Sequence, residues 1–317
     1  MNRTQQVLAA ALAIQILLSV VLFWPKTVTT GSSGPLLPDV KKEDIVAITV
    51  TDNEGKSVLL RQVAGNWVLP EADDYPLKAE RITQALDKIV GLTTRRLITR
   101  TEASYKRLQV AADDFLRRLD LETANGTKYT LFLGSSPSYG NTHVRLDGRS
   151  ETYLATNLTP WEFSSAPGYW VDTSYFNVPQ DQVTKISIQN PKGTFTLEKD
   201  ADGKWTLSDL APGEELATET VNLIVTRATS VTMLRPLGKE KRPEYGLDNP
   251  VAVVTLQKGE EAITLSIGTQ DPTDNSYVVN VSTSPYYVRV GDYMVKPLVE
   301  NGRENLFPPK ATPTPQT

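Results

Sequence analysis

The chain has 317 residues, of which 39% are hydrophobic and 22% are charged, and its net charge is −4. This length can hold two domains with their own cores, the composition excludes a disordered chain, and the charge does not favour a nucleic-acid partner. The chain lacks cysteine, which excludes disulfides, thiolate metal sites, a cysteine nucleophile and a lipid-modified N-terminal cysteine. Because His143 is the single histidine, we predict no zinc site and no cofactor.

An uncharged apolar run occupies residues 7–24. As a helix it would span about 27 Å, close to the hydrocarbon thickness of a bilayer, and Trp24 followed by Pro25 suits the interface at its end. We predict a transmembrane anchor at residues 1–26, with the N-terminus inside and the rest of the chain extracytoplasmic. A cleaved signal peptide and a buried core helix are the alternatives, and cleavage stays open. Residues 27–42, rich in Gly, Ser, Thr and Pro, predict a flexible tether.

Residues 43–156 predict a first α+β domain. Alternating apolar residues around Ile48 predict a strand, and two turns then return the chain to Trp67. Pro76 suits the first turn of a helix, whose apolar face consists of Ile82, Leu86 and Ile89. A hairpin across Asn125-Gly126 and two further strands complete the predicted sheet.

The second half of the chain repeats the first. Residues 45–69 align without a gap with residues 183–207, which pairs Trp67 with Trp205, and Gly134 later pairs with Gly268. Such an internal repeat predicts two domains of one architecture. The predicted fold is therefore α+β: a tandem repeat of two similar domains, each an antiparallel sheet of hairpins with one or two packed helices, plus an N-terminal transmembrane helix. Repetition of both tryptophans favours core packing over ligand stacking.

An aromatic linker at residues 157–180 separates the two predicted domains. Pro and Gly interrupt it, and its aromatic side chains predict packing against both domains. The second domain, residues 181–307, contains a predicted helix near residues 214–229 with an apolar side made of Val221, Ile224, Val225 and Ala228. Residues 308–317 predict a disordered tail.

Two passages carry a family likeness. The first, residues 169–207, includes Trp170 and Asp172. The second begins with Tyr245-Gly246-Leu247 and Pro250 and continues to a predicted strand pair at residues 277–290. Together they resemble the bacterial family called domain of unknown function 4340. In the first half, Tyr105-Lys106-Arg107-Leu108 only loosely matches the Tyr245 motif, so that half resembles a divergent copy.

The resemblance implies a protein of the bacterial cytoplasmic membrane with one N-terminal helix, often encoded beside an ABC-type permease and a gliding-motility-like auxiliary component. It implies no known reaction and no catalytic residues. The implied role is a non-enzymatic, extracytoplasmic accessory subunit of an ABC-type transport or gliding-like envelope assembly. Its expected partners are the permease, auxiliary envelope subunits and, through residues 7–24, the membrane.

Several motifs that suggest chemistry have simpler structural interpretations. Gly55-Lys56-Ser57 lacks the upstream glycine of a phosphate loop, and Asp200-Ala201-Asp202-Gly203 lacks the later ligands of a calcium loop, so both predict turns. Asp73-Asp74 and Asp113-Asp114 would serve a hydrolase only if acids from different segments faced one cleft. His143 lies in a predicted strand, which favours a packing role. No catalytic residue is predicted.

Two candidate binding surfaces remain. Arg95, Arg96 and Arg100 belong to a basic stretch that is either a solvated face or a patch for an acidic partner or anionic headgroups. The linker aromatics suit stacking on sugars, which gives an envelope polysaccharide-binding module as the alternative function; they are Trp161, Tyr169, Trp170 and Tyr175. A carboxylate-dependent hydrolase is the third alternative.

Overall fold

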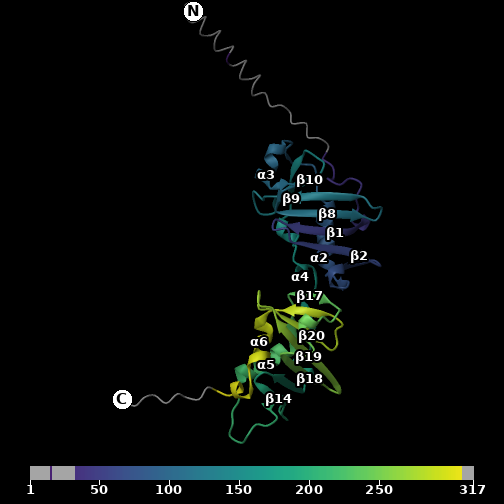
Figure 1. Ribbon diagram of the computed structural model, residues 1–317. Coiled ribbons are helices and arrows are strands. Elements are labelled where there is room, and N and C mark those ends of the chain that lie inside the picture. Colours follow the sequence, from purple (N-terminus) through teal and green to yellow (C-terminus); the bar gives the residue numbers. More distant parts are fainter. Residues whose placement is uncertain (1–14, 16–32, 309–317) are drawn as a thin grey trace, which may run out of the picture.

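The structure is a computed structural model that describes residue 15 and residues 33–308 (Figure 1). Apart from Gln15 and Pro308, the predicted membrane anchor and the predicted C-terminal tail lie outside the described residues. Among the residues that are described, no helix is both long and apolar enough to cross a membrane. The described chain forms two large antiparallel sheets with packed helices, an N-terminal and a C-terminal half that lie end to end. The prediction of an α+β protein is confirmed.

The N-terminal sheet has nine strands. They are β1 (Ile45–Asp52), β2 (Ser57–Val63), β3 (Asn66–Leu69), β4 (Tyr75–Pro76), β5 (Leu97–Thr99), β8 (Arg117–Thr123), β9 (Lys128–Leu133), β10 (Asn141–Leu146) and β11 (Thr152–Thr156). Their order across the sheet is β4-β3-β2-β1-β8-β9-β10-β11-β5. Side chains alternate between the two faces of a strand, so β8 alternates between buried and half-buried residues and places Leu119 and Leu121 in the core.

Helix α2 (Ala79–Val90) buries the predicted face of Ile82, Leu86 and Ile89 in this core and ends at Gly91. The predicted start of this helix at Pro76 is wrong, because Pro76 belongs to β4 and pairs with Val68. Proline fits there since β4 is the last strand of the sheet and pairs with no further strand on its other side. Helix α3 (Tyr105–Leu108) and the small ribbon of β6 (Val110–Ala111) and β7 (Asp114–Phe115) complete this half.

The C-terminal sheet has eight strands. They are β13 (Lys185–Asn190), β14 (Gly193–Lys199), β15 (Trp205–Leu207), β17 (Arg235–Gly238), β18 (Ala252–Lys258), β19 (Glu261–Gln270), β20 (Tyr277–Val281) and β21 (Tyr287–Val290), in the order β15-β14-β13-β18-β19-β20-β21-β17. Helix α5 (Thr218–Thr229) buries its predicted apolar side and packs on α6 (Asp292–Glu300). Helix α6, which contains Pro297, is not among the predicted elements.

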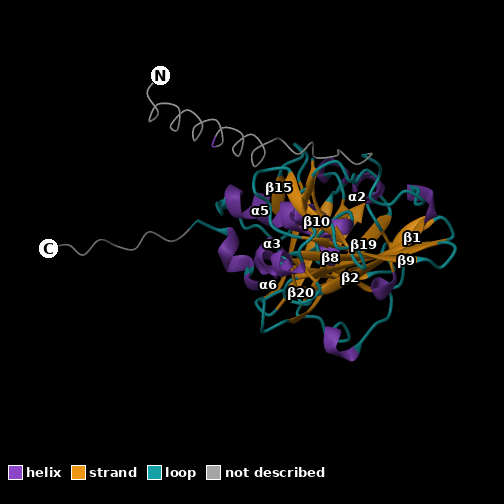
Figure 2. Ribbon diagram, turned by 90° about the horizontal axis from the view of Figure 1, so that it is seen from above, coloured by secondary structure: helices purple, strands orange, loops and turns teal. Residues whose placement is uncertain are grey.

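The two sheets have closely related strand orders. Each starts with a three-stranded meander, β1-β2-β3 or β13-β14-β15, and each adds a second meander, β8 to β11 or β18 to β21, next to the first strand. In each, a short strand that follows the helix, β5 or β17, closes the far edge. In Figure 2, which looks down on the view of Figure 1, strands of the two halves overlap in projection, for example β8 and β19.

The aromatic linker packs into the molecule. It contains α4 (Pro167–Trp170) and β12 (Ser174–Asn177), and β12 pairs with β16 (Ser230–Thr232) of the C-terminal half. Phe163, Trp170 and Phe176 are buried and belong to one core cluster that includes residues of both halves. Lys78 N, at the start of α2, donates to the Trp170 carbonyl at 2.7 Å. The linker therefore contacts both halves, as its composition predicts.

The flexible tether predicted at residues 27–42 is wrong for its described part, residues 33–42. Leu36, Leu37 and Val40 are 7%, 2% and 7% exposed and join the core of the N-terminal half. Leu36 N donates to the Leu92 carbonyl at 2.7 Å, and Thr94 N donates to the Gly34 carbonyl at 2.9 Å. Burial of three aliphatic side chains outweighs the flexibility of the surrounding Gly, Ser and Pro residues.

The two halves meet at one edge of each sheet. Asp73, next to β4, accepts a hydrogen bond from Lys239 N, next to β17, at 2.5 Å. The rings of Tyr75 and Tyr286 make an edge-to-face contact with centroids 4.6 Å apart. The β4 edge of the N-terminal sheet is thus covered by the C-terminal half, whereas β5 is the opposite edge.

Candidate functional site

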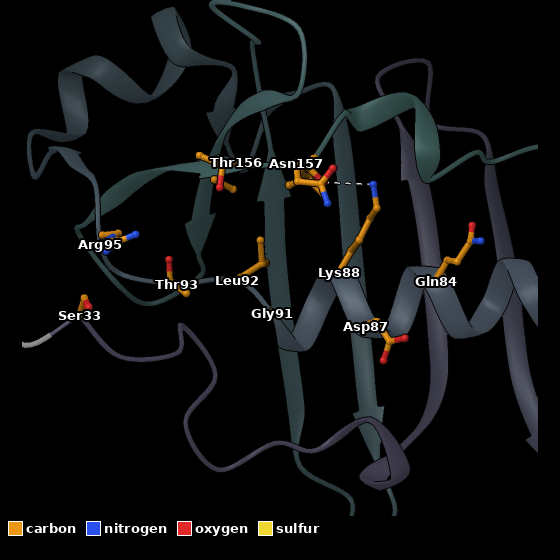
Figure 3. Close-up of a pocket in the computed structure, with 12 residues that line it drawn as sticks. Ser33, Gln84, Asp87, Lys88, Gly91, Leu92, Thr93, Arg95, Thr156 and Asn157 are labelled. Carbon is orange, nitrogen blue, oxygen red and sulfur yellow. Dashed lines mark hydrogen bonds between the residues drawn. The ribbon is translucent and has the colours of Figure 1, made fainter.

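A cavity of about 650 Å³ lies on the N-terminal half and includes Ser33 in its wall. This volume is within the range of small-molecule pockets. Four segments supply the wall (Figure 3): the chain at Ser33, helix α2, the loop that follows this helix, and the end of β11 with the residues after it. The lining residues are Ser33, Gln84, Asp87, Lys88, Gly91, Leu92, Thr93, Arg95, Ala155, Thr156, Asn157 and Leu158.

Two charged groups of this cavity already have partners. Lys88 Nζ donates to the Asn157 carbonyl at 3.1 Å and forms an ion pair with Glu162, and Asp87 pairs with Lys42 at 3.0 Å. Partial burial acts to raise the pKa of Glu162, but hydrogen bonds from Lys88 and from the Thr159 backbone outweigh it and lower that pKa. These pairs join α2 to neighbouring segments. Arg95 differs from them because it is exposed on the cavity rim.

The predicted basic residues border the open edge strand β5. Arg95, Arg96 and Arg100 are all exposed, and Arg100 Nε lies 3.2 Å from Glu151 Oε1. Between them, Leu97 and Ile98 are 38% and 39% exposed. The structure therefore brings the predicted cations together on one sheet edge and adds two apolar side chains that the charge pattern did not identify.

His143 makes a side-chain contact with a serine. Its Nδ1 lies 3.1 Å from Ser135 Oγ, and Ser135 Oγ also donates to the Leu108 carbonyl at 3.2 Å. Ser135 Oγ thus has two hydrogen-bond partners, and the imidazole tautomer decides which atom donates in its contact with His143. Burial lowers the pKa of His143, and the charge of Arg107 lowers it further against the opposing effect of the Ser135 backbone. This geometry supports the predicted packing role.

The two predicted carboxylate pairs lie in different parts of the structure. Asp73 and Asp74 have left-handed backbones, with φ of 51° and 60°, at the junction of the two halves. Asp113 forms an ion pair with Lys106 at 2.7 Å beside the β6–β7 ribbon, and that hydrogen bond lowers the pKa of Asp113. The structure does not bring these pairs into one cleft. Within residues 33–308, no cluster of three or more His, Asp or Glu side chains is arranged to hold a metal ion.

The residues of the C-terminal half that the sequence suggests as a family motif pack against one another. Gly246 has a left-handed backbone, with φ of 65°, and lies against Thr269. The Tyr245 carbonyl and the Leu247 side chain lie directly over Gly268, where a Cβ would be less than 3.0 Å from the carbonyl oxygen. In the N-terminal half the Leu108 carbonyl covers Gly134 equally closely. Pro250 is half-buried just before β18.

The two predicted core tryptophans, Trp67 and Trp205, are less buried than the linker residue Trp170. Trp67 and Trp205 are half-buried and pack against the core, and Lys199 Nζ lies 5.2 Å from the Trp205 ring centroid. Trp170 is 1% exposed, and its indole nitrogen donates to the Ser164 carbonyl at 2.8 Å. Asp172 is exposed and accepts a hydrogen bond from Ser174 N at 2.9 Å. All four positions are explained by local structure.

The linker aromatics do not form a shared stacking platform. Trp170 is buried, Tyr169 packs edge-on against it under the Arg81 guanidinium, and the Tyr175 hydroxyl donates to the Tyr286 carbonyl at 2.6 Å. Of the four predicted sugar-stacking residues, Trp161 is the largely exposed one, at 66%, with the Arg117 guanidinium 5.0 Å from its ring centroid.

Sequence patterns missed the cavity and the attachment of residues 33–42, because both depend on contacts between segments far apart in the chain. A signal for the attachment was present, since Leu36, Leu37 and Val40 are apolar residues inside the predicted tether. The exposed pair Leu97 and Ile98 was also visible, as two large aliphatic residues within a run of arginines.

Comparison with known families gives one match. The family model described as Domain of unknown function (DUF4340) matches residues 67–237. The matched range starts in β3 and ends in β17, so it covers parts of both halves and includes Trp170 and Asp172, whereas Tyr245 and Gly268 lie beyond it. Searches of curated proteins and of solved structures found no match.

Proposed function

The chain belongs to the DUF4340 family, and on that premise we propose that it is a non-enzymatic, membrane-anchored, extracytoplasmic accessory subunit of an ABC-type transport or gliding-like envelope assembly. It acts through protein–protein contacts with a permease and auxiliary envelope subunits. The observation that carries the proposal is the uncharged apolar run at residues 7–24, because a run of this length suits a bilayer.

The way the chain follows this run supports anchoring. Only a short stretch separates Trp24 from Ser33, and from Gly34 onward the chain is hydrogen-bonded to the N-terminal half. A protein built this way stays close to its anchor, with its larger surface on one side of the membrane. In this proposal residues 33–308 lie outside the cytoplasmic membrane.

The engagement of the polar groups supports a scaffold role. Lys88 joins α2 to the linker, Asp73 joins the two halves, and His143 fixes Ser135. In each case the group that would be needed for proton transfer or nucleophilic attack is already used in a structural contact. This pattern is typical of a protein that presents surfaces to partners.

The two related strand orders support a tandem repeat within this scaffold. Trp67 and Trp205 occupy β3 and β15, which correspond in the two orders. Gly134 and Gly268 are each covered by a backbone carbonyl of a preceding segment. A duplicated domain would provide two similar sheet edges: β17, which lies against the N-terminal half, and β5, which is open.

Detergent extraction and affinity purification of the full-length tagged chain test the role. We expect permease and auxiliary subunits to be recovered together with the chain. A matched control is the chain that lacks residues 1–26, which should lose these partners if they are met at the membrane. Repeated recovery of the full-length chain alone, with the anchor intact, would contradict the proposal.

The exposed ring of Trp161 favours one second candidate, a module that binds envelope polysaccharide. Titration with cell-wall fragments would then change tryptophan fluorescence, and W161A would abolish the change while W205A would retain it. An unchanged spectrum across the titration favours the accessory-subunit role.

A further inference from the structure

The two edges of the nine-stranded sheet are occupied differently. The C-terminal half covers the β4 edge through Tyr286 and Lys239. At the opposite edge, β5 pairs with β11 on one side, and Leu97 and Ile98 are more than one-third exposed. Large aliphatic side chains on an unpaired edge strand are a liability in water unless something covers them.

The chain that comes from the predicted anchor attaches at this same edge. Gly34 N donates to Thr94 Oγ1 at 3.2 Å, and Thr94 N donates to the Gly34 carbonyl at 2.9 Å. Figure 3 shows Ser33 near Thr93 and Arg95. Fully extended, the stretch from Trp24 to Ser33 reaches at most about 30 Å. A membrane helix that ends at Trp24 therefore keeps the β5 edge within reach of the bilayer, whereas the β4 edge lies at the other side of the sheet, next to the C-terminal half.

The charge of this edge is opposite to the charge of the whole protein. Arg95, Arg96 and Arg100 are exposed here, and Arg149 is close enough to act on Tyr153 of β11 together with Arg100. The neighbouring acids are Glu151, which pairs with Arg100, and Glu102. Cations thus outnumber acids at the β5 edge although the whole chain carries a net charge of −4.

We infer that the β5 edge binds anionic phospholipid headgroups, with Arg95, Arg96 and Arg100 at the phosphates and Leu97 and Ile98 in the interface. This inference rests on the proposed membrane anchor. The short connection to that anchor gives the edge a high effective concentration at the lipid surface, so a few contacts suffice to hold it there.

A protein partner that adds a strand to β5 would cover the same residues. The observations favour lipid over this partner for two reasons. Strand β5 has three residues, and short edges flanked by charges resist strand addition. In addition, the chain from the anchor attaches at this edge and not at the β4 edge.

The lack of cysteine allows a direct test on the full-length chain. A nitroxide is attached to I98C at the edge or to D202C in an exposed turn of the C-terminal half, and the untagged chain is reconstituted into vesicles. A nickel-chelating lipid relaxes any nitroxide close to the headgroups. In vesicles of phosphatidylglycerol and phosphatidylcholine we expect strong relaxation at I98C and little at D202C, with the I98C signal reduced in pure phosphatidylcholine and in high salt.

Charge removal gives the size of the effect. In the I98C background, R95Q/R96Q should lower the ratio of protein whose β5 edge lies at the headgroups to protein whose β5 edge lies away from them. The expected decrease is roughly 25-fold, about fivefold for each cation. The matched control R61Q/K204Q removes two exposed cations elsewhere and should leave the ratio unchanged. Equal behaviour of the two double variants would overturn the inference.

Other outcomes separate the inference from the proposed function. If an alkaline wash strips the full-length chain from the vesicles, the proposed anchor fails. If the chain stays in the vesicles but I98C is no closer to the headgroups than D202C, the anchor stands and the lipid contact is overturned. Protection of I98C only after other membrane proteins are added identifies a protein-docking edge and also overturns the lipid assignment.

Discussion

Both halves contain the same kind of backbone contact, a carbonyl oxygen packed over a glycine, but they build it from different residues. In the C-terminal half the Tyr245 carbonyl covers Gly268, and the turn that places it uses Gly246 with φ of 65°. In the N-terminal half the Leu108 carbonyl covers Gly134, and the left-handed position belongs to Gln109, with φ of 54°. The covered glycine is the same in both halves because a side chain there would displace backbone, whereas the covering segment varies because only its carbonyl is used.

The halves differ more at their far edges. β17 and β5 take the same place in their sheets, but β17 lies against the N-terminal half, where Gly238 packs on Asp73 and Pro236 is buried. β5 is open and is bordered by arginines. What the halves share therefore describes how the fold is built, and where they differ shows which sheet edge stays open.

The strongest test of the shared contact is an alanine at each covered glycine. In both G268A and G134A the new Cβ would be less than 3.0 Å from a backbone oxygen, so the covering segment must move. We expect each to lower the free energy of unfolding by about 3 kcal/mol, measured by hydrogen exchange in its own half. Gly126 has open space around it, so G126A serves as the control for backbone strain alone. A loss in G134A no larger than in G126A would break the comparison.

A smaller effect is expected at the paired tryptophans. Trp67 and Trp205 are both half-buried against the core, so W67A and W205A should each lower the free energy of unfolding by about 2 kcal/mol. Urea unfolding followed by circular dichroism measures both. The phenylalanine variants keep most of the apolar area and should recover more than half of the loss. A large loss in one half with none in the other would show that the two positions are not equivalent.

The matched glycines and tryptophans of the two halves also show how much of the fold the sequence could predict. Local patterns identified the sheets, the buried faces of α2 and α5, and the turn glycines, because each depends on neighbouring residues. They did not identify α6, whose Pro297 obscures a helical pattern, or the attachment of Leu36 and Leu37, which depends on Leu92. For the candidate site, the charge pattern identified Arg95, Arg96 and Arg100. It could not show that they border an open sheet edge, because edge positions follow from long-range strand pairing.

The contact between the two halves at the β4 edge provides the next test. Tyr286 contacts the Tyr75 ring edge-on, its hydroxyl donates to the Asp74 carbonyl at 3.4 Å, and Lys239 Nζ lies 4.9 Å from its ring centroid. We expect Y286A to weaken the contact between the halves by about 1 kcal/mol, while Y286F keeps the ring and most of the contact. Faster hydrogen exchange at the Lys239 amide, which is bonded to Asp73, would report the loosening. Unchanged exchange in Y286A would mean that the linker alone holds the halves together.

The smallest expected effect is a difference between the two halves in how their stability depends on pH. His143 in β10 and Tyr277 in β20 are both buried. The two strands take matching places, since β10 lies between β9 and β11 and β20 lies between β19 and β21. Burial, with Arg107, lowers the pKa of His143 from 6.5, so the unfolded chain binds the proton more readily. The contribution of His143 to stability is therefore complete above pH 6.5 and is lost as the pH falls through the folded pKa. Burial raises the pKa of Tyr277 from 10.0, so its contribution is complete below pH 10 and is lost at higher pH.

The N-terminal half should thus lose stability as the pH falls below 6.5, whereas Tyr277, at the matching position of the C-terminal half, does not titrate in that range. Because His143 is the single histidine, one imidazole resonance reports its titration by NMR, and we expect a midpoint below 6.5. H143F removes the titrating group and should abolish the part of the acid-side loss that sets in at pH 6.5, whereas carboxylates with a lowered pKa, such as Glu162, lose their contribution at lower pH. A midpoint at or above 6.5 would mean that the Ser135 contact favours the charged ring more than burial disfavours it. In that case His143 would stabilise the N-terminal half in acid, and the contributions of His143 and Tyr277 would no longer be lost at opposite ends of the pH range.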